Sequence, residues 1–190
     1  MKNNTEELIK IALEGNESAF ESLLRPHRSS ILNLALKMTG NMEDAMEIAQ
    51  ETIIKIFKYL HSFQSDKNFR NWVLKIVVNS THDFWKKRKR DEGMMEEHKR
   101  SVFGLSSENP EKRLMQREIR EKINSCLKAL SPKERSVFLL RDGEGMSIQE
   151  TSSILGYSSA SVRTHLCRAR KKIRERIQII YPACGHGERK

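Results

Sequence analysis

Apolar residues recur three and four positions apart along most of the chain, a spacing typical of amphipathic helices. In the first half this pattern predicts four helical stretches. They cover about residues 8–12, 20–38, 43–60 and 69–84. Gly15-Asn16 and Gly40 end the first two stretches, and a polar loop, 61–68, precedes the fourth. Because no segment alternates convincingly with period two, the pattern favours an all-α protein.

The helical pattern dissolves between Asp91 and Asn109, where glycine, serine and mixed charges replace it. Pro110 then suits the first position of a new helix, with Asn109 as its cap. One face of this helix is predicted to carry Met115, Ile119, Ile123, Cys126 and Leu130. We therefore predict two small helical domains, 5–90 and 111–180, joined by a flexible linker at 91–110.

The last third of the chain carries clear helix start and stop signals. The segments 131–134 and 147–150 both place a serine three residues before a glutamate, which is the pattern of a capping box. The segment 142–145 breaks the first of these helices, and Gly156 is suited to end the second. A basic helix follows from about Ser159 to Ile179. Helix, tight turn and basic helix together predict a helix-turn-helix.

Charge points to a polyanionic partner. The 190 residues include 35 Lys and Arg against 25 Asp and Glu, a net charge of +10. Cations that neutralise phosphates release condensed counterions, so a basic chain is suited to nucleic acid. Net charge alone leaves open a soluble protein that is merely basic.

The basic helix has two distinct sides. Val162 and Leu166 are four residues apart and are expected to face the core. The opposite side carries the predicted DNA contacts, Arg163, Thr164, Cys167, Arg168 and Lys171. A guanidinium can satisfy the two major-groove acceptors of guanine, which makes the two arginines the candidates for base or phosphate contacts. The alternative is a solvated basic helix without a DNA role.

The C-terminal segments resemble region 4 of sigma factors. The resemblance rests on Leu130-Ser-Pro-Lys-Glu-Arg-Ser-Val-Phe-Leu-Leu, Ser147-Ile-Gln-Glu, Ile154-Leu-Gly and Ser161-Val-Arg-Thr-His-Leu-Cys-Arg-Ala-Arg. It implies binding to the polymerase beta flap and to the minus-thirty-five promoter element. The same segments also resemble the output domain of LuxR-type response regulators. Thr151-Ser152 departs from the sigma pattern, which usually has small or medium apolar residues there.

The N-terminal half resembles sigma region 2, over about residues 5–90. The blocks that carry this are Glu43-Asp-Ala-Met-Glu-Ile-Ala-Gln-Glu-Thr and Phe69-Arg-Asn-Trp-Val-Leu-Lys-Ile-Val-Val-Asn. A response regulator would instead need strands and a phospho-acceptor aspartate. Except for Asp91–Asn109 and the C-terminal tail, the chain is therefore similar to the short, extracytoplasmic-function (ECF) class of the sigma-70 family, whose members direct promoter-specific initiation by core RNA polymerase.

An acidic side is predicted for the helix at 43–60. The expected buried stripe is Ala45, Ala49, Ile53, Ile56, Phe57 and Leu60. The opposite surface then presents Asp44, Glu47, Gln50 and Glu51. Acidic charge repels nucleic acid and favours a protein partner. The resemblance implies that these residues dock on the beta-prime clamp helices of core polymerase, whereas the alternative is a solvated helix face.

The end of the fourth helical stretch is predicted to contact minus-ten DNA. Asn79 is expected to end a buried helix turn, and a run of cations follows at 86–90. The candidate DNA contacts are Asn79, Lys86, Lys87 and Arg88. The resemblance implies that the loop 61–68 and the surface near Asn79 hold an extruded base. Trp72 is expected in the core because it falls on the apolar stripe, while Phe84 and Trp85 are weaker candidates for strand contact.

Other chemistry is not expected. His165 and Cys167 point about 200° apart on a helix and cannot chelate one metal together. Cys184 and His186 could do so only with outside ligands. No catalytic motif, cofactor site, secretory signal or membrane-inserting stretch of about 20 apolar residues is apparent, and three scattered cysteines suit a cytoplasmic protein.

Family members are commonly held inactive by an anti-sigma factor, often membrane-linked. The alternatives left open are a free-standing LuxR-like regulator and, more remotely, a helical interaction protein that uses the acidic face alone.

Overall fold

The computed structural model of the protein describes residues 2–91 and 110–181. Every regular element in this part of the chain is a helix or a helical turn, which confirms the all-α prediction. The chain divides into two compact units, Met1–Ser101 and Val102–Lys190, and each is described by itself. Most of the predicted linker, 91–110, lies outside the described residues.

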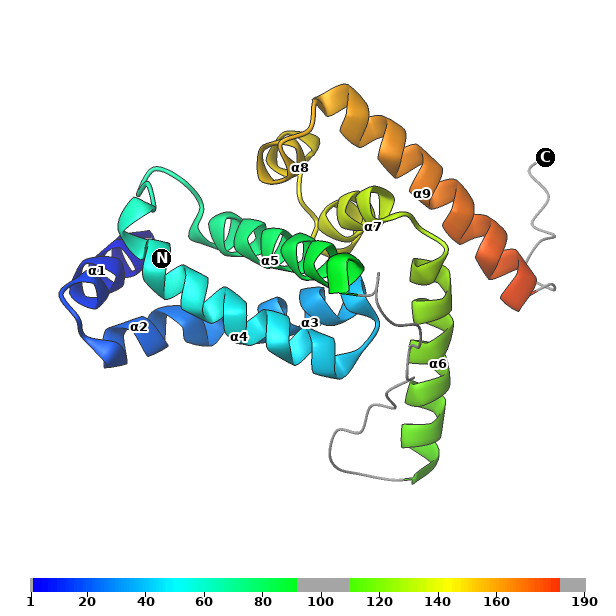
Figure 1. Cartoon of the computed structure of the whole chain (residues 1–190), viewed down its shortest axis with the longest axis horizontal. Helices are drawn as coiled ribbons and strands as arrows, with labels where there is room; N and C mark the ends of the chain where they lie inside the picture. The colour runs from blue at the N-terminus through cyan, green and yellow to red at the C-terminus, as the bar shows by residue number, and fades with distance from the viewer. Residues whose placement is uncertain (1, 92–109, 182–190) are drawn as a thin grey trace. The chain divides into compact units, whose positions relative to one another are not determined.

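The first unit contains a succession of helices with short turns (Figure 1). These are α1 (Lys2–Leu13), α2 (Glu17–Leu24), a 3-10 turn η1 (Arg25–His27), α3 (Arg28–Thr39), α4 (Met42–Tyr59), a 3-10 turn η2 (Leu60–Ser62) and α5 (Phe69–Asp91). Helices α3, α4 and α5 pack on one another, and α1 packs on α2. Their fully buried side chains include Leu34, Met38, Ile48, Ile56, Leu74 and Val77.

The predicted second helix is in fact two helices. The 3-10 turn at Arg25–His27 separates α2 from α3. Pro26 explains the break, because proline has no backbone N–H to donate to the carbonyl four residues earlier. The uniform apolar spacing across this point concealed the break in the sequence.

The buried stripe of α4 was predicted correctly at Ala45, Ile56 and the following Leu60, but not at Ala49, Ile53 and Phe57. The buried residues are Ala45, Ile48, Thr52 and Ile56. Ala49 and Ile53 are only half-buried, and Phe57 is 61% exposed. Thr52 is a polar residue at a fully buried position, so a search for apolar side chains selects the neighbouring stripe instead. The shift rotates the predicted exposed side of α4 as well.

The second unit begins with α6 (Pro110–Lys128) and contains the predicted helix-turn-helix (Figure 1). The later elements are α7 (Pro132–Phe138), a short π-helical turn η4 (Leu139–Gly143), α8 (Ile148–Leu155) and α9 (Ser159–Ile180). Both predicted capping boxes are confirmed, at Ser131 with Glu134 and at Ser147 with Glu150. Each fixes a helix start by satisfying backbone N–H groups that have no partner within the helix.

Helix α9 supplies much of the core of the second unit. Val162 and Leu166 are buried as predicted, and they form a cluster with Val137 of α7. Of the predicted apolar face of α6, Cys126 and the following Leu130 are buried, and Leu127 is buried as well. Ile119 and Ile123 remain largely exposed. The sequence pattern of α6 therefore describes an apolar face that the described residues do not fully cover.

Gly156 allows the tight turn between α8 and α9. Its φ is +67°, in the left-handed region that side chains disfavour, and no atom would obstruct a Cβ there. Gly156→Ala should therefore destabilise the second unit by about 1–2 kcal/mol through the backbone alone. Hydrogen exchange of peptides from α8 and α9 measures this loss of protection.

Gly143→Ala is the matched control. Gly143 lies in η4 without a positive φ, and its nearest contact would be Leu139 Cδ2 at 3.8 Å, an ordinary van der Waals distance. Alanine there should leave protection unchanged or increase it. Equal losses of protection in Gly156→Ala and Gly143→Ala would show that the destabilisation does not come from the positive φ of Gly156.

Candidate nucleic-acid and protein interfaces

The four predicted polymerase contacts of α4 differ in their surroundings. Glu47 and Gln50 are exposed, whereas Asp44 and Glu51 are half-buried and form ion pairs. Glu47 and Glu51 also line a groove between α4 and α5. The remaining residues that line this groove are Asp83, Phe84, Lys87 and Arg90. Glu47 and Gln50 thus present the most accessible polar groups of this face.

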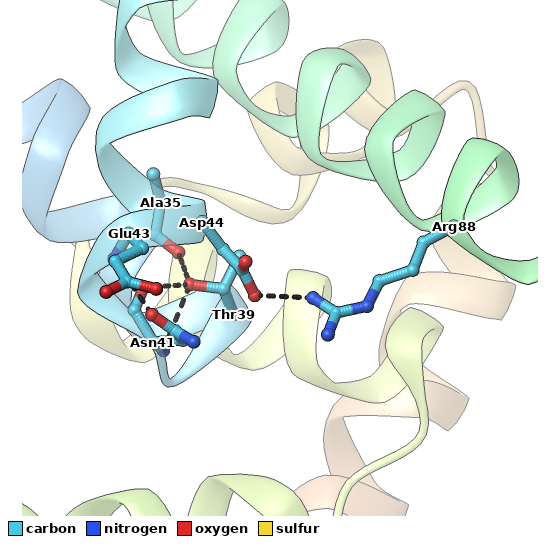
Figure 2. Close-up of polar contacts among 6 residues, drawn as sticks. All are labelled: Ala35, Thr39, Asn41, Glu43, Asp44 and Arg88. Carbon is cyan, nitrogen blue, oxygen red and sulfur yellow. Dashed lines mark hydrogen bonds and ion pairs between the residues drawn. The ribbon is translucent and has the colours of Figure 1, made fainter. Parts of the chain in front are cut away.

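Asp44 lies in the first turn of α4 and contacts the far end of α5. Arg88 Nη1 donates a hydrogen bond to Asp44 Oδ2 at 2.9 Å (Figure 2). The turn before α4 is held by two local contacts, since Asn41 Oδ1 accepts from the Glu43 N–H at 2.8 Å and the Thr39 hydroxyl donates to the Ala35 carbonyl at 2.9 Å. The carboxylate that receives Arg88 is therefore fixed in place.

Lys55 connects the middle of α4 to α5. Its Nζ lies 2.8 Å from Glu51 Oε1 and 3.3 Å from Asp83 Oδ2. Burial alone would lower the pKa of Lys55, but hydrogen bonds to both carboxylates outweigh it and raise the pKa above the ordinary lysine value. Glu51 thus holds a cation of its own helix and is less available to a partner than Glu47.

An exposed apolar row on α4 was missed in the sequence. Met46, Ile54 and Phe57 are 50%, 65% and 61% exposed. Met46 and Ile54 lie four residues before and after Gln50, and Phe57 lies three residues after Ile54, so all of them share one side of the helix. Phe57 makes an edge-on contact with Phe20 at 5.2 Å between ring centres but remains open to solvent. The displaced stripe prediction had assigned Phe57 to the core.

Asn79 does not end a helix turn, contrary to the prediction. It is exposed in the middle of α5, which continues to Asp91. Its neighbours Ser80 and Thr81 are buried, and the Thr81 hydroxyl donates to the Val77 carbonyl at 2.9 Å. Lys86 and Lys87 are exposed, whereas Arg88 is half-buried against α4. The four predicted minus-ten contacts therefore do not form one continuous surface.

An aromatic cluster joins the two ends of the loop before α5. Phe63 and Phe69 lie at its two ends with ring centres 5.2 Å apart, and Trp72 is 5.4 Å from Phe63 and 5.6 Å from Phe69. Trp72 packs against both phenylalanine rings but is only half-buried, so its predicted core position is met only in part. The residues between, 64–68, are exposed. The cluster fixes where this polar loop begins and ends.

The predicted DNA-facing side of α9 is exposed throughout. It consists of Arg163, Thr164, Cys167, Arg168 and Lys171. Val162, Leu166 and Ala169 are buried on the opposite side. Ser158 caps the helix by accepting a hydrogen bond from the Ser161 N–H at 3.1 Å. The leading turns of α9 therefore present a polar and cationic surface on a fixed helix.

Three other cations of α9 hold the second unit together, although in the sequence they are simply part of a basic helix. Arg170 makes two hydrogen bonds to Asp142, at 2.8 and 2.7 Å. Lys172 Nζ lies 2.7 Å from Glu134 Oε2, and Arg176 donates to Ser125 Oγ at 3.1 and 3.0 Å. These partners are 28 to 51 residues away, so no local signal could have revealed them.

Comparison with known proteins identifies the family. The model for sigma-70 region 2 matches residues 23–91, and the model for sigma-70 region 4 matches residues 120–173. Relatives include the ECF RNA polymerase sigma factor SigW of Bacillus subtilis, which is 26% identical over 90% of this chain and 95% of its own length. The chain belongs to the ECF group of the sigma-70 family.

Two further relatives agree with this assignment. The RNA polymerase sigma-H factor of Pseudomonas aeruginosa is 25% identical over 91% of this chain and 93% of its own length. Among solved structures, the sigma factor RpoE of Bartonella quintana in complex with the anti-sigma factor NepR shares the fold, with a TM-score of 0.69 and 19% identity over 84% of this chain and 97% of that one. The region 2 match excludes the LuxR-type alternative, and the protein is an alternative sigma factor.

Within the described residues of this sigma factor, no group of three or more His, Cys, Asp and Glu side chains could hold a metal ion. Cys184 and His186 lie outside those residues. Helices long and apolar enough to cross a membrane are likewise absent from 2–91 and 110–181.

The two carboxylates that hold α9 in region 4 are acidic groups with depressed pKa values. Arg170 lowers the pKa of Asp142 by direct hydrogen bonding, against a smaller opposing effect of burial. Burial raises the pKa of Glu134, but Lys172 and the capping contacts of Ser131 outweigh this and leave it below its ordinary value. Ionised carboxylates therefore stabilise the folded form of region 4.

Region 4 should lose stability in acid. A depressed carboxyl pKa contributes stability that is complete above the unfolded-state pKa of about 4 and is lost as pH falls through the folded-state pKa. Glu134→Gln should cost about 1–2 kcal/mol at neutral pH and make the acid loss shallower. Urea unfolding followed by circular dichroism, repeated from neutral pH down to below pH ~4, measures the stability loss and its pH dependence. An unchanged pH dependence in this variant would contradict the role of Glu134.

Proposed function

We propose that this sigma factor docks on core RNA polymerase through the exposed side of α4 and positions two helical surfaces on promoter DNA. The observation that carries the proposal is the mixed row on α4, in which Met46 and Ile54 flank the accessible Glu47 and Gln50. Exposed apolar side chains beside carboxylates suit a protein partner, because desolvated apolar anchors provide affinity and charges set the register.

The family implies that the partner surface is the clamp-helix pair of the beta-prime subunit. Such a surface would have to provide cations for Glu47 and Glu51. Asp44 is already bound to Arg88, so it contributes less to docking than the sequence prediction gave it. Glu47 is therefore the leading polar contact.

A second docking surface is proposed in region 4. Ile119 and Ile123 of α6 are exposed, and so are Ile177 and Ile179 of α9. Helices α6 and α9 pack on each other, and Lys122 lies 4.9 Å above the Tyr181 ring, which ties the ends of the two helices together. The family expectation of beta-flap binding fits Ile119 and Ile123 best, since these two exposed side chains lie four residues apart on one side of α6.

The promoter contacts are proposed on two elements. The leading turns of α9, through Arg163, Thr164, Cys167, Arg168 and Lys171, would read minus-thirty-five DNA from the major groove. In region 2, the exposed loop 64–68, Asn79, Lys86 and Lys87 would bind the minus-ten strand. Cationic side chains bind the strand backbone, and the polar loop would hold an extruded base.

Control by an anti-sigma factor is part of the proposal. The related RpoE of Bartonella quintana is bound to the anti-sigma factor NepR in its solved structure. A partner that covered the mixed row of α4 would block docking on polymerase directly. The protein would act in the cytoplasm as an initiation factor without enzymatic activity of its own.

Reconstitution with sigma-free core polymerase tests the function. The protein should bind core and support runoff transcription from a subset of genomic promoters. Tight binding to duplex DNA without any binding to core would contradict the proposal.

Charge reversal at Glu47 should separate docking from folding. Glu47→Lys should weaken core binding by about tenfold or more while the thermal unfolding curve is unchanged, because the side chain is exposed. Fluorescence titration of labelled protein with core polymerase measures the affinity. Glu7→Lys on α1 is the matched control, an exposed charge reversal elsewhere in the same unit, and should leave core binding intact. Equal affinities of the two variants would remove Glu47 from the docking surface.

Arginine truncation on α9 should change sequence preference. Arg163→Ala is expected to cost about 1–3 kcal/mol at one base pair of the minus-thirty-five element and to relax specificity there. Competition between promoter fragments mutated at each position measures this. Arg174→Ala, an exposed arginine farther along the same helix, should leave the preference unchanged. An unaltered preference in Arg163→Ala would exclude it from base recognition.

A further inference from the structure

The five cations at the end of α5 do not share one environment. Lys86, Lys87, Lys89 and Arg90 are exposed, whereas Arg88 is half-buried. Its side chain is 32% exposed, and that of its partner Asp44 is 20% exposed. The internal contacts of the exposed cations are long, 4.0 Å from Lys86 Nζ to Asp83 Oδ1 and 3.4 Å from Arg90 Nε to the Lys86 carbonyl, so these cations can reach a phosphate at little cost. Arg88 would first have to leave Asp44.

Helix geometry explains this difference. Arg88 lies four residues after Phe84, seven after Thr81 and eleven after Val77, so it continues the side of α5 that is buried. Val77 and Thr81 are fully buried on that side. The Arg88 guanidinium carbon lies 5.9 Å from the centre of the Phe84 ring, a distance at which cation–π attraction acts. Arg88 therefore points toward the body of region 2 and its neighbours do not.

The anchor for Arg88 is rigid. Asp44 is in the first turn of α4, where the helix dipole favours a negative charge. Gly40 ends α3 with a φ of +74°, Asn41 caps α4, and Thr39 bonds the Ala35 carbonyl at 2.9 Å, so the turn before Asp44 is held by contacts of its own (Figure 2). A charged pair from a fixed turn to a helix end restrains that end.

We propose that the Asp44–Arg88 pair is a clip that holds the last turns of α5 against α4, and that Arg88 is a positioning residue for Lys86 and Lys87. This inference rests on the proposed function, because it takes the end of α5 as part of the minus-ten surface. It gives both residues a different role from the predicted one, which was a polymerase contact for Asp44 and a DNA contact for Arg88. Asp44 acts on DNA binding through Arg88, and Arg88 acts through the helix it restrains.

The clip and a purely electrostatic argument predict opposite effects of Asp44→Asn on DNA binding. Removing the negative charge of Asp44 should strengthen DNA binding if only charge matters, since DNA is a polyanion. With the clip, Asp44→Asn should weaken binding instead, by roughly the same factor as Arg88→Gln. That factor is expected to be about fivefold, and the double variant should be no weaker than Arg88→Gln alone, because both substitutions remove the Asp44–Arg88 pair and only Arg88→Gln also removes the Phe84 contact.

The experiment uses full-length protein at saturating core polymerase. The probe is a pre-melted fragment of one promoter taken from the runoff assay, and its dissociation constant is measured for Asp44→Asn, Arg88→Gln and the double variant. Lys87→Gln is the matched control, an adjacent exposed cation whose effect should add to that of Asp44→Asn. Hydrogen exchange of residues 84–90 in the free protein should increase in both clip variants and stay unchanged in Lys87→Gln.

Stronger or unchanged DNA binding by Asp44→Asn would overturn the proposal, and so would additive effects of the two clip substitutions. The exchange measurement separates this from failure of the proposed function. If Lys87→Gln binds the probe normally while exchange still increases in the clip variants, the minus-ten surface is wrong and the pair is only structural. If binding falls in Lys87→Gln but exchange does not change in the clip variants, the surface stands and the clip is wrong.

Discussion

The register in which α4 packs on α3 and α5 determines most of what region 2 can present. A helix has one side to bury, and here that side is defined by Ala45, Ile48, Thr52 and Ile56. Once these residues face inward, Glu47 and Ile54 must face outward together. A shift by one residue would bury part of the mixed row and expose the stripe. The side of α4 that packs in the interior thus also determines which side chains its interaction surface presents.

In region 4, ion pairs determine which cations of the surface helix are exposed. A long basic helix at the surface must be both attached to its unit and available to DNA. In α9, Arg170 and Lys172 bind carboxylates of its own unit, while Arg163 and Arg168 stay exposed. The attached cations lie toward the later turns of α9 and the free surface lies at its start. Position along the helix therefore separates the attached cations from Arg163 and Arg168, whereas Lys171 is exposed between Arg170 and Lys172.

Local signals were predictable from the sequence, and long-range contacts were not. The capping boxes at Ser131 and Ser147 and the turn at Gly156 each depend on a few adjacent residues, so their patterns were sufficient. Thr52 misled the prediction of α4, because a buried threonine looks polar. Arg88 could not be assigned, because its partner Asp44 is 44 residues away and the run 86–90 reads as uniform charge. The exposed side of α9 was predictable because the side on which a residue lies follows from helical periodicity alone.

The uncovered apolar side chains have a consequence for the protein before it meets its partners. Met46, Ile54 and Phe57 in one unit and Ile119 and Ile123 in the other are open to water in the isolated chain. Such surfaces favour self-association, and chaperones and proteases act on chains that expose them. The unassembled protein is consequently the vulnerable form, so its cellular lifetime depends on how soon those side chains are covered.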